Sequence, residues 1–302
     1  MLQPKMDSAS LVAFVQVSES GSFSQAAEQM FLTQSAVSKR VALLEQQLDT
    51  RLFDRIGRQV SLTEAGRTLL PQARDILHAL EDAARSLQNL SGHVSGKLSL
   101  AASHHISLHR LPPVLRAYTQ RFPQVALNLR FDESEIAYEG VLKGDLELAL
   151  ITLAPQSDPR IHSETLWVDS LQYVVASDHP LAQLSKPDLS ALNRYPALLP
   201  APDTFTYQLV QKQLARLGLE PNLGMSTNYL DTIRMMVRIG LGWSLLPESM
   251  IDSGLTRLPI TDRPIHRPLG LIYHRDRTLT NAARELVKML RDTCPPPASD
   301  SR

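Results

Sequence analysis

Four residues with reactive side chains stand close together in one short segment: Ser103, His104, His105 and His109. A serine beside histidines could serve a hydrolase, but the chain has no G-x-S-x-G motif that would expose such a nucleophile. His105 and His109 are spaced i, i+4, which allows both to hold one metal ion, but no carboxylate or cysteine stands nearby in the sequence to complete that site. We therefore expect no catalytic residue and no metal site. His104 or His105 instead donates to an anion or caps a helix.

Polar residues also stand where other predicted strands end. Thr152 ends the run LELALIT, Thr204 follows ALLPAPD, and Asn228 follows NLGMST. Free N–H groups and the helix dipole favour anions at helix N-termini. We expect a small anionic ligand here, with Phe205 and Trp243 as apolar walls, although each polar residue could equally be an ordinary helix cap. The predicted ligand residues are Ser103, His104, His105, Thr152, Thr204, Phe205 and Asn228.

These positions require strands that alternate with helices. From Lys97 on, strand-like runs alternate with segments of helical pattern. The alternation predicts an α/β fold with mostly parallel strands, helices on both faces, and ligands beyond the carboxyl ends of the strands. The expected strands are KLSLAAS, VALNLRF, LELALIT, LQYVVAS, ALLP, NLGMST, GWSLLP and PLGLIYH, and the expected helices cover 108–121, 134–142, 207–217, 229–239 and 280–292.

The first 62 residues predict short helices separated by tight turns. Asp7 can cap the first helix, which Gly21 ends, and Ser24 can cap the second. Thr33 can cap a third helix that reaches Leu48. A polar hairpin, DRIGRQVSLT with Gly57 at its tip, follows.

The third helix has two contrasting faces. Val37, Val41, Leu44 and Leu48 share one face, and the opposite face is slim and polar, as entry into a DNA major groove requires. Glutamine can pair with adenine, serine hydroxyls can donate to phosphates, and basic side chains add charge. The alternative is a helical core with a solvated basic edge. The predicted DNA-binding residues are Thr33, Gln34, Ser35, Ser38, Lys39, Arg40, and Arg55 and Arg58 of the hairpin.

A long helix is predicted after Thr63, its N-cap, and can extend to Leu90. Its apolar residues recur with spacings of four and three, which is the seam of a helix pair. We expect dimerisation along this seam; the alternative is packing on the helix's own domain. SGHVSG at 91–96 follows as a hinge. The predicted dimer residues are Leu69, Ala73, Ile76, Leu80, Ala83 and Leu87.

Bulk composition excludes several classes of protein. The 302 residues include 31 Lys+Arg and 31 Asp+Glu, so overall charge indicates no nucleic-acid partner and any DNA-binding charge must be local. The single cysteine, Cys294, cannot form an internal disulfide, which suits a reducing cytoplasm. No signal-like start and no run near ~18 apolar residues is present, so we expect a cytoplasmic protein without a membrane partner.

The first 66 residues closely resemble the N-terminal domain of LysR-type transcriptional regulators. The matching segments are AFVQVSESGSFSQAAEQMFLTQSAVSKRVALLEQQL, RLFDRIGRQVSLTEAG and the long helix after them. The resemblance implies a bacterial winged helix-turn-helix with the helix from Thr33 as recognition helix and 53–62 as wing. Ser35, Lys39 and Arg40 stand where the family usually has proline, arginine and glutamine, which puts the sequence of the operator in doubt.

The resemblance continues, less specifically, through LKGDLELALIT and MVRIGLGWSLLPESM. It implies a winged domain over 1–62, a linker helix over 63–92 and an effector-binding domain over 93–302. That last domain would have two α/β subdomains of periplasmic-binding-protein type: subdomain I over about 96–166 and 268–294, and subdomain II over about 167–267.

The implied partners are double-stranded DNA, a small-molecule effector (a carboxylate), and further copies of the chain in a homodimer and homotetramer. RNA polymerase is a further partner of such a regulator. No cofactor and no enzymatic activity are expected. A periplasmic-type binding protein without DNA function is the remaining alternative, against which the winged domain argues.

Overall fold

The computed structural model describes residues 6–56, 59–185, 187–260 and 265–293, without the side chains of residues 55, 56 and 59. Internal contacts divide the chain into two compact units, residues 1–90 and 91–302. The first unit is mostly helical, and the second combines helices with a large sheet. Gly57, expected at the tip of the hairpin, Arg58, expected to bind DNA, and Cys294 all lie outside the described residues.

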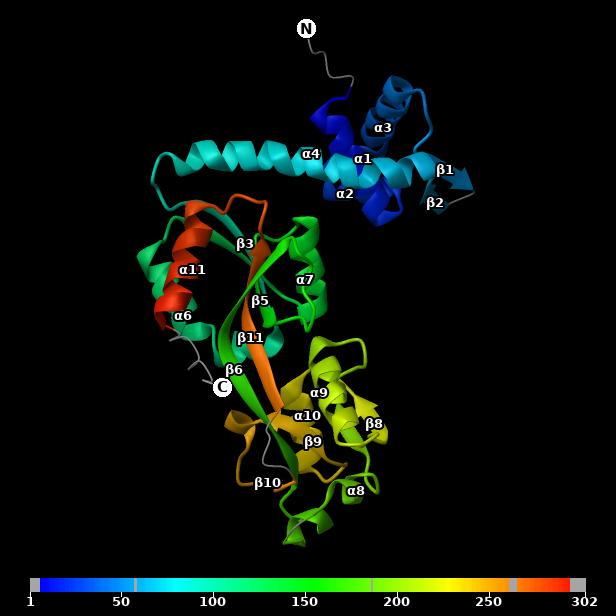
Figure 1. Ribbon diagram of the computed structural model, residues 1–302. Helices are drawn as coiled ribbons and strands as arrows, with labels where there is room; N and C mark the ends of the chain where they lie inside the picture. Colours follow the sequence, from blue (N-terminus) through cyan, green and yellow to red (C-terminus); the bar gives the residue numbers. More distant parts are fainter. Residues whose placement is uncertain (1–5, 57–58, 186, 261–264, 294–302) are drawn as a thin grey trace. The chain divides into compact units, whose positions relative to one another are not determined.

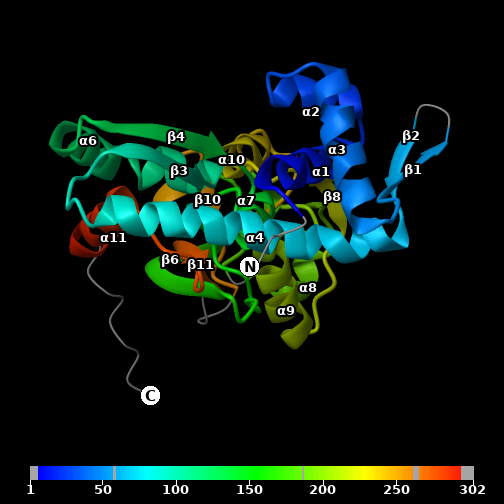
Figure 2. The ribbon, with the colours of Figure 1, turned by 90° about the horizontal axis from the view of Figure 1, so that it is seen from above.

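The first unit contains three short helices, a hairpin and one long helix (Figures 1 and 2). Asp7 caps the first helix and Gly21 ends it with a left-handed φ of 63°, as expected. The second cap was predicted wrongly: Ser22, not Ser24, accepts from Gln25 N–H, because the helix begins directly at Phe23. The elements are α1 (Ser8–Ser20), α2 (Phe23–Gln29), α3 (Gln34–Leu48), β1 (Phe53–Ile56), β2 (Gln59–Leu62) and α4 (Glu64–Asn89).

Part of the apolar seam predicted on α4 is buried in the core of the first unit. Leu69 is 9% exposed and Ala73 is fully buried, and both pack among the apolar residues of α1, α2 and α3. These two residues therefore pack on their own domain, which was the alternative to dimerisation. Farther along α4, exposure rises from 39% at Ile76 to 53% at Leu80 and 70% at Leu87.

The second unit is built around a seven-stranded sheet in the order β10-β6-β11-β5-β3-β4, with β9 paired to β6. β7 and β8 form a separate parallel pair, and an isolated bridge links Ala197 of β7 to Trp243, the residue before β9. The strands are β3 (Gly96–Ala102), β4 (Val125–Phe131), β5 (Leu148–Thr152), β6 (Ile161–Ala176), β7 (Ala197–Leu199), β8 (Leu223–Ser226), β9 (Ser244–Pro247), β10 (Leu255–Arg257) and β11 (Ile265–His274).

The expectation of mostly parallel strands was wrong for this sheet. Only β3 pairs in parallel, with β4 and β5, whereas β6 pairs antiparallel with β9, β10 and β11, and β11 with β5. The reason is topological. The chain passes from the first subdomain to the second along β6 and returns along β11, so these crossover strands run in opposite directions.

Helices cover both faces of each subdomain. In the first subdomain, α6 and α11 pack on one face of the sheet and α7 packs on the other (Figure 1). In the second, α9 and α10 cover opposite faces. The helices are α5 (His104–His109), α6 (Pro112–Arg121), α7 (Ser134–Lys143), α8 (Leu189–Leu192), α9 (Phe205–Arg216), α10 (Leu230–Arg238) and α11 (Asn281–Thr293), with short 3-10 turns at Pro180–Gln183 and Glu248–Met250.

The helix expected over 108–121 was also predicted wrongly. The structure has two helices, α5 and α6, with a break at Arg110 and Leu111. Pro112 and Pro113 start the second helix, where the first turn needs no N–H donor, but neither has an N–H that could continue the preceding helix. The break leaves His104 and His105 on a short helix of their own.

Candidate functional site

The third helix shows the two faces that its sequence predicts. Thr33 caps it by accepting from Ala36 N–H at 3.2 Å. Val37, Val41 and Leu44 are fully buried in the core of the first unit. The polar residues at the start and on the outer face are exposed or half-buried: Thr33, Gln34, Ser35, Ser38, Lys39 and Arg40.

The side chains of Gln34, Lys39 and Arg40 make no hydrogen bond or ion pair with any residue that the structure describes. They are therefore available to an external partner such as the edge of a base or a phosphate. The wing is attached to this helix by Glu45, whose Oε1 accepts from Leu52 N–H at 2.8 Å and Phe53 N–H at 3.2 Å. The sequence did not indicate this role of Glu45, because its partners are backbone N–H groups. Of the wing residues, Arg55 has no described side chain and Arg58 lies outside the described residues.

The turn between α2 and α3 holds an unusual residue. Phe31 has a φ of 54°, in the left-handed region that disfavours residues with a side chain, and its side chain is 95% exposed. Phe31 stands two residues before Thr33, the cap of α3. Nothing in the sequence pattern predicted this conformation.

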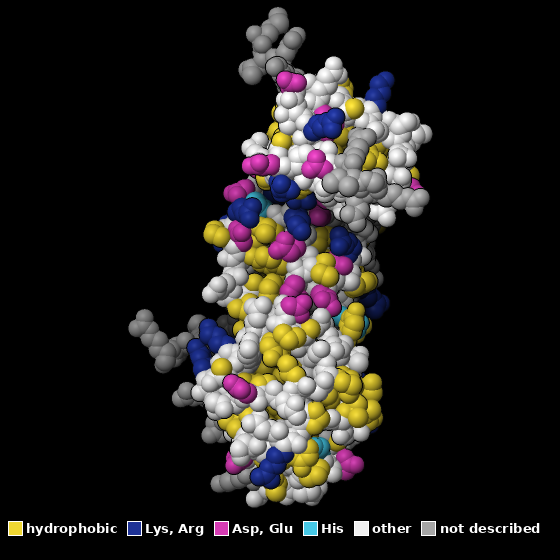
Figure 3. Space-filling view, turned by 90° about the vertical axis from the view of Figure 1, so that its right-hand side faces the viewer, with side chains coloured by type: hydrophobic (Ala, Val, Ile, Leu, Met, Phe, Trp, Pro, Cys, Tyr) yellow, Lys and Arg dark blue, Asp and Glu magenta, His cyan; other side chains and the backbone are white. Residues whose placement is uncertain are grey.

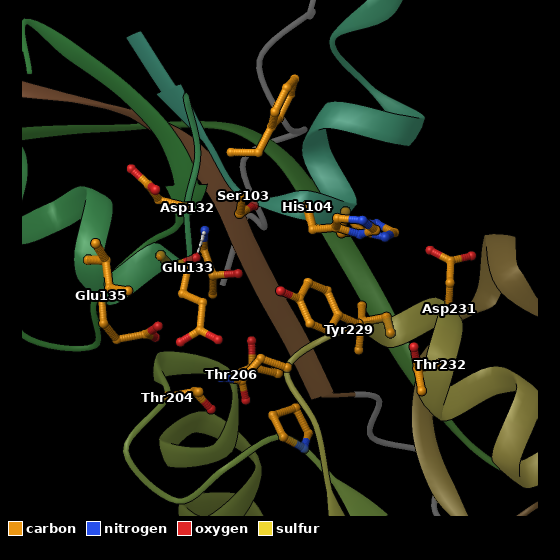
Figure 4. A pocket seen from close by; sticks show the side chains of 18 of the residues that line it. Ser103, His104, Asp132, Glu133, Glu135, Thr204, Thr206, Tyr229, Asp231 and Thr232 are labelled. Carbon is orange, nitrogen blue, oxygen red and sulfur yellow. Dashed lines mark hydrogen bonds between the residues drawn. The ribbon is translucent and has the colours of Figure 1, made fainter. Parts of the chain in front are cut away.

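The second unit contains a cavity of about 650 Å³, which we call the interlobe cavity (Figure 4). Its walls come from the ends of β3, β4 and β5 in the first subdomain and from the starts of α9 and α10 in the second. Its volume is in the range of small-molecule sites. Its polar lining includes Ser103, His105, Glu133, Glu135, Thr152 and Arg267.

Six of the seven predicted ligand residues line this cavity: Ser103, His104, His105, Thr152, Thr204 and Asn228. Phe205 does not line it; its ring lies edge-on against Tyr138. Trp243 was also predicted wrongly as a wall of the site. It is fully buried in the core of the second subdomain, where its Nε1 donates to the carbonyl of Leu192 at 3.1 Å.

A buried charge cluster lies at the crossover strands. Asp169 on β6 and Arg267 on β11 are both 3% exposed and form an ion pair. Arg110 donates to the same carboxylate at 3.0 Å. Burial alone would raise the pKa of Asp169, but the bond to His105 and the charge of Arg267 outweigh it and hold that pKa far below its usual range. Asp169 therefore stays ionised, and the two arginines leave the cluster with one excess positive charge.

His105 lies against this cluster, with Nε2 3.2 Å from Asp169 Oδ2. Burial is the strongest influence on its pKa and lowers it, against the opposing effect of Asp169. The imidazole is therefore neutral near pH 7, and its buried Nδ1 has no hydrogen-bond partner among the described residues. Because Nε2 faces the ionised Asp169 and carries the single N–H of the neutral ring, Nδ1 can accept a hydrogen bond in the cavity.

The two subdomains touch across the cavity at several points. The N–H of Phe205, at the start of α9, donates to Glu135 Oε1 at 2.5 Å. His104 meets Tyr229 edge-on at 5.0 Å between ring centroids, and His109 Nε2 lies 3.5 Å from Asp231 Oδ2. Thus the anion-binding N-terminus predicted for α9 is already occupied by a carboxylate of the protein itself.

Sequence reasoning missed the acidic residues Glu133 and Glu135 and the pair of Asp169 with Arg267. The acids directly follow the strand VALNLRF, so the strand-end rule applied to Thr152 would have found them. Asp169 and Arg267 precede the predicted strands LQYVVAS and PLGLIYH, and no local pattern in the sequence indicated that they pair. Within the described part of the chain, no group of three metal-ligating side chains is present and no helix is long and apolar enough to cross a membrane.

Comparison with known proteins shows which protein families the two units match. Residues 9–67 match the model of the bacterial regulatory helix-turn-helix protein, lysR family, and residues 91–295 match the LysR substrate binding domain. An uncharacterized HTH-type regulator of Azotobacter vinelandii is 68% identical over 108 residues, which cover 36% of this chain and 75% of that protein. The regulator YwqM of Bacillus subtilis (strain 168) is 28% identical over 95% of this chain and 99% of its own length.

Solved structures share the fold. Full-length OxyR from Pseudomonas aeruginosa, in a variant with one cysteine replaced by aspartate, has a TM-score of 0.71 at 22% identity, covering 96% of each chain. Full-length CbnR, in a complex with its target DNA, has a TM-score of 0.61 at 21% identity, covering 96% of this chain and all of that one.

A winged helix-turn-helix joined to a two-lobed unit around a cavity defines a DNA-binding protein coupled to a ligand-binding domain. The matches cover most of the chain. The protein belongs to the LysR-type transcriptional regulators, with a helix-turn-helix DNA-binding domain and a substrate-binding domain.

Proposed function

We propose that the protein binds promoter DNA with α3 as recognition helix and the β1–β2 hairpin as wing. The observation that carries this proposal is the contrast between the two faces of α3. Apolar residues fix one face to the core, and the other presents Gln34, Lys39 and Arg40 without partners among the described residues. The proposed DNA contacts are Thr33, Gln34, Ser35, Ser38, Lys39, Arg40, Arg55 and Arg58.

The interlobe cavity is the proposed site of a small effector that carries a carboxylate. Ser103 and Thr152 are buried, line the cavity, and have no side-chain hydrogen bond with a described residue. Arg267 lines the same wall and belongs to the cluster with excess positive charge. His104 and His105 add polar groups on one side, and Thr204 and Asn228 on the other. This role requires binding without turnover of the ligand.

The exposed part of α4 is the proposed dimer contact, through Ile76, Leu80, Ala83 and Leu87. An apolar row of this kind stays exposed only at a cost, which a second copy of the helix relieves. Dimers would associate further into tetramers in the cytoplasm, where the DNA-bound protein can meet RNA polymerase.

Effector binding would act as a population shift: the ligand prefers one arrangement of the subdomains, and that preference alters the state in which DNA is bound. The test begins with selection of duplexes from a random library by the full-length protein. Enrichment of one motif, bound with affinity that falls as salt rises, is expected. Failure to enrich any motif contradicts the proposal. The bend of the selected duplex is then measured with and without small carboxylates.

A further inference from the structure

The interlobe cavity contains more acidic than basic side chains. Arg267 is its only lining arginine or lysine among the described residues, and it pairs with Asp169, which does not line the cavity. In Figure 3, Asp and Glu side chains gather on the face of the second unit at the level of α7. The acidic residues that line the cavity are Asp132, Glu133, Glu135 and Asp231.

Three of these four acids have partners within the protein. Asp132 lies 2.9 Å from the guanidinium of Arg130, and Asp231 lies 3.4 Å from that of Arg234. Glu135 accepts the N–H of Phe205. Glu133 alone has a side chain that makes no hydrogen bond or ion pair with a described residue.

Acidic residues at the start of a helix can simply stabilise the helix dipole, and Glu133 stands at the N-cap of α7. However, its side chain makes no cap hydrogen bond. Instead, Figure 4 shows Glu133 and Glu135 pointing together toward Thr204 and Thr206 of the second subdomain. Burial and the negative charge of Glu133 both raise the pKa of Glu135. Two carboxylates held together in this way favour a cation between them.

The opposite wall of the cavity contains buried polar groups, most of them hydrogen-bond donors, that lack partners among the described residues. Arg267 is 3% exposed and its Nε has no hydrogen-bond partner in the described part of the chain. His105, 7% exposed, has an unpartnered Nδ1 on the same wall. The free hydroxyls of Ser103 and Thr152 line the cavity beside them. Buried polar groups without partners are uncommon. A ligand anion would accept from Arg267 Nε–H and the two hydroxyls, whereas Nδ1 of the neutral His105 would accept from a ligand donor.

From this polarity we propose that the ligand is a zwitterion of the amino-acid type, with its ammonium group at Glu133 and Glu135 and its carboxylate toward Ser103, Thr152 and Arg267. The inference rests on the proposed role of the cavity as the effector site. It adds the requirement for a cationic group. A simple dicarboxylate would place a second negative charge near two glutamates, which is unfavourable in a partly desolvated site.

The test uses the full-length protein and three matched sets of probes. These are the amino acids, their des-amino counterparts with hydrogen in place of the amine, and their amides with the carboxylate removed. Thermal shift identifies binders and calorimetry gives their Kd. For any amino acid that binds, the des-amino and amide forms are each expected to bind at least tenfold more weakly.

Glu133→Gln is the diagnostic variant. It should weaken binding of the amino acid about tenfold and reduce the discrimination against the des-amino form to less than about threefold. Glu139→Gln, on the same helix but outside the interlobe cavity and 3.5 Å from Lys143, is the matched control and should leave both affinities unchanged. An unchanged melting temperature of each variant without ligand excludes a folding defect.

Equal binding of the des-amino acids, unchanged discrimination in Glu133→Gln, or a lack of any amino-acid binder each overturns the inference. Binding of carboxylates without an amine would leave the proposed effector site intact while removing the zwitterion. The DNA-selection experiment decides the regulatory function independently of all these outcomes.

Discussion

Asp169 and Arg267 are direct register partners on the two antiparallel crossover strands, β6 and β11, and form a buried ion pair there. The residues on either side of this pair belong to different cores: Leu166 and Leu269 to the first subdomain, Leu171 and Ile265 to the second. The pair thus lies where both strands pass between subdomains, at the wall of the interlobe cavity. A change in the angle between the subdomains would therefore bend the two strands at this ion pair.

Removing one charge of this pair should destabilise the second unit strongly. Asp169→Asn leaves Arg267 buried without a counterion, and such losses cost roughly 3–5 kcal/mol. Urea unfolding followed by tryptophan fluorescence measures the effect, because both tryptophans, Trp167 and Trp243, lie in the second unit. Asp158→Asn, at an exposed ion pair with Arg160, is the control and should leave the midpoint nearly unchanged. An Asp169→Asn midpoint equal to that of the native protein would show that the buried charge is compensated elsewhere.

Glu135 should make stability depend on pH in a definite direction. Burial, the largest influence, raises its pKa in the folded protein above the ordinary value of about 4.3. The folded state therefore binds this proton more tightly than the unfolded state. Its stabilising contribution is complete below the ordinary pKa and is lost as pH rises through the raised one.

Glu135→Gln removes this titration while keeping an oxygen that can accept from Phe205 N–H. The melting temperature of the variant relative to the native protein should therefore increase as pH rises from about 4.5 toward neutrality, and then level off. Thermal melts at half-unit pH steps measure the difference, with Glu139→Gln as the exposed control. A difference that does not vary with pH would mean that Glu135 titrates normally.

The sequence predicted best what local pattern determines. Thr33 as N-cap, the end of α3 at Leu48, and the burial of Val37, Val41 and Leu44 all follow from caps and helical spacing, and the structure confirms them. The ends of several strands were also predictable, and six of the polar residues predicted there line one cavity. The cap at Ser22 and the break before Pro112 are local features as well. The sequence contains the signals for both, but the cap was assigned to the wrong serine and the helix was continued through the proline.

Contacts between distant segments could not be read in the same way. The heptad spacing on α4 indicates a packed stripe but does not identify what packs against it, and Leu69 and Ala73 turned out to face their own domain. Glu135 meets Phe205, and Asp169 meets Arg267, only because the topology brings separate strands and helices together. Trp243 was assigned to a ligand wall by residue type, whereas a fully buried indole with a satisfied N–H is ordinary core.

The exposed half of α4 gives a prediction for assembly. Leu80 is 53% exposed in the single chain, so burying the rest contributes roughly half of the about 1.5–3 kcal/mol of a fully buried leucine, and a symmetric dimer buries it in both copies. Leu80→Glu should therefore weaken dimerisation by at least about a hundredfold. Sedimentation at micromolar concentration measures this effect. Ser86→Glu, off the seam on the same helix, is the charge-matched control, and dissociation by both variants alike would indicate a general charge effect instead of a specific seam.

Gln34 and Lys39 should affect DNA binding in different ways. A glutamine that pairs with adenine contributes about 1–3 kcal/mol of discrimination, so Gln34→Ala should flatten the ranking of single-base operator variants more than it lowers overall affinity. Lys39→Ala should instead weaken binding to all sequences and reduce the slope of log affinity against log salt by about one. Fluorescence anisotropy on the selected motif and its variants, at several salt concentrations, separates the two effects. An unchanged ranking in Gln34→Ala would remove Gln34 from base reading and leave the sequence preference to other residues on the outer face of α3.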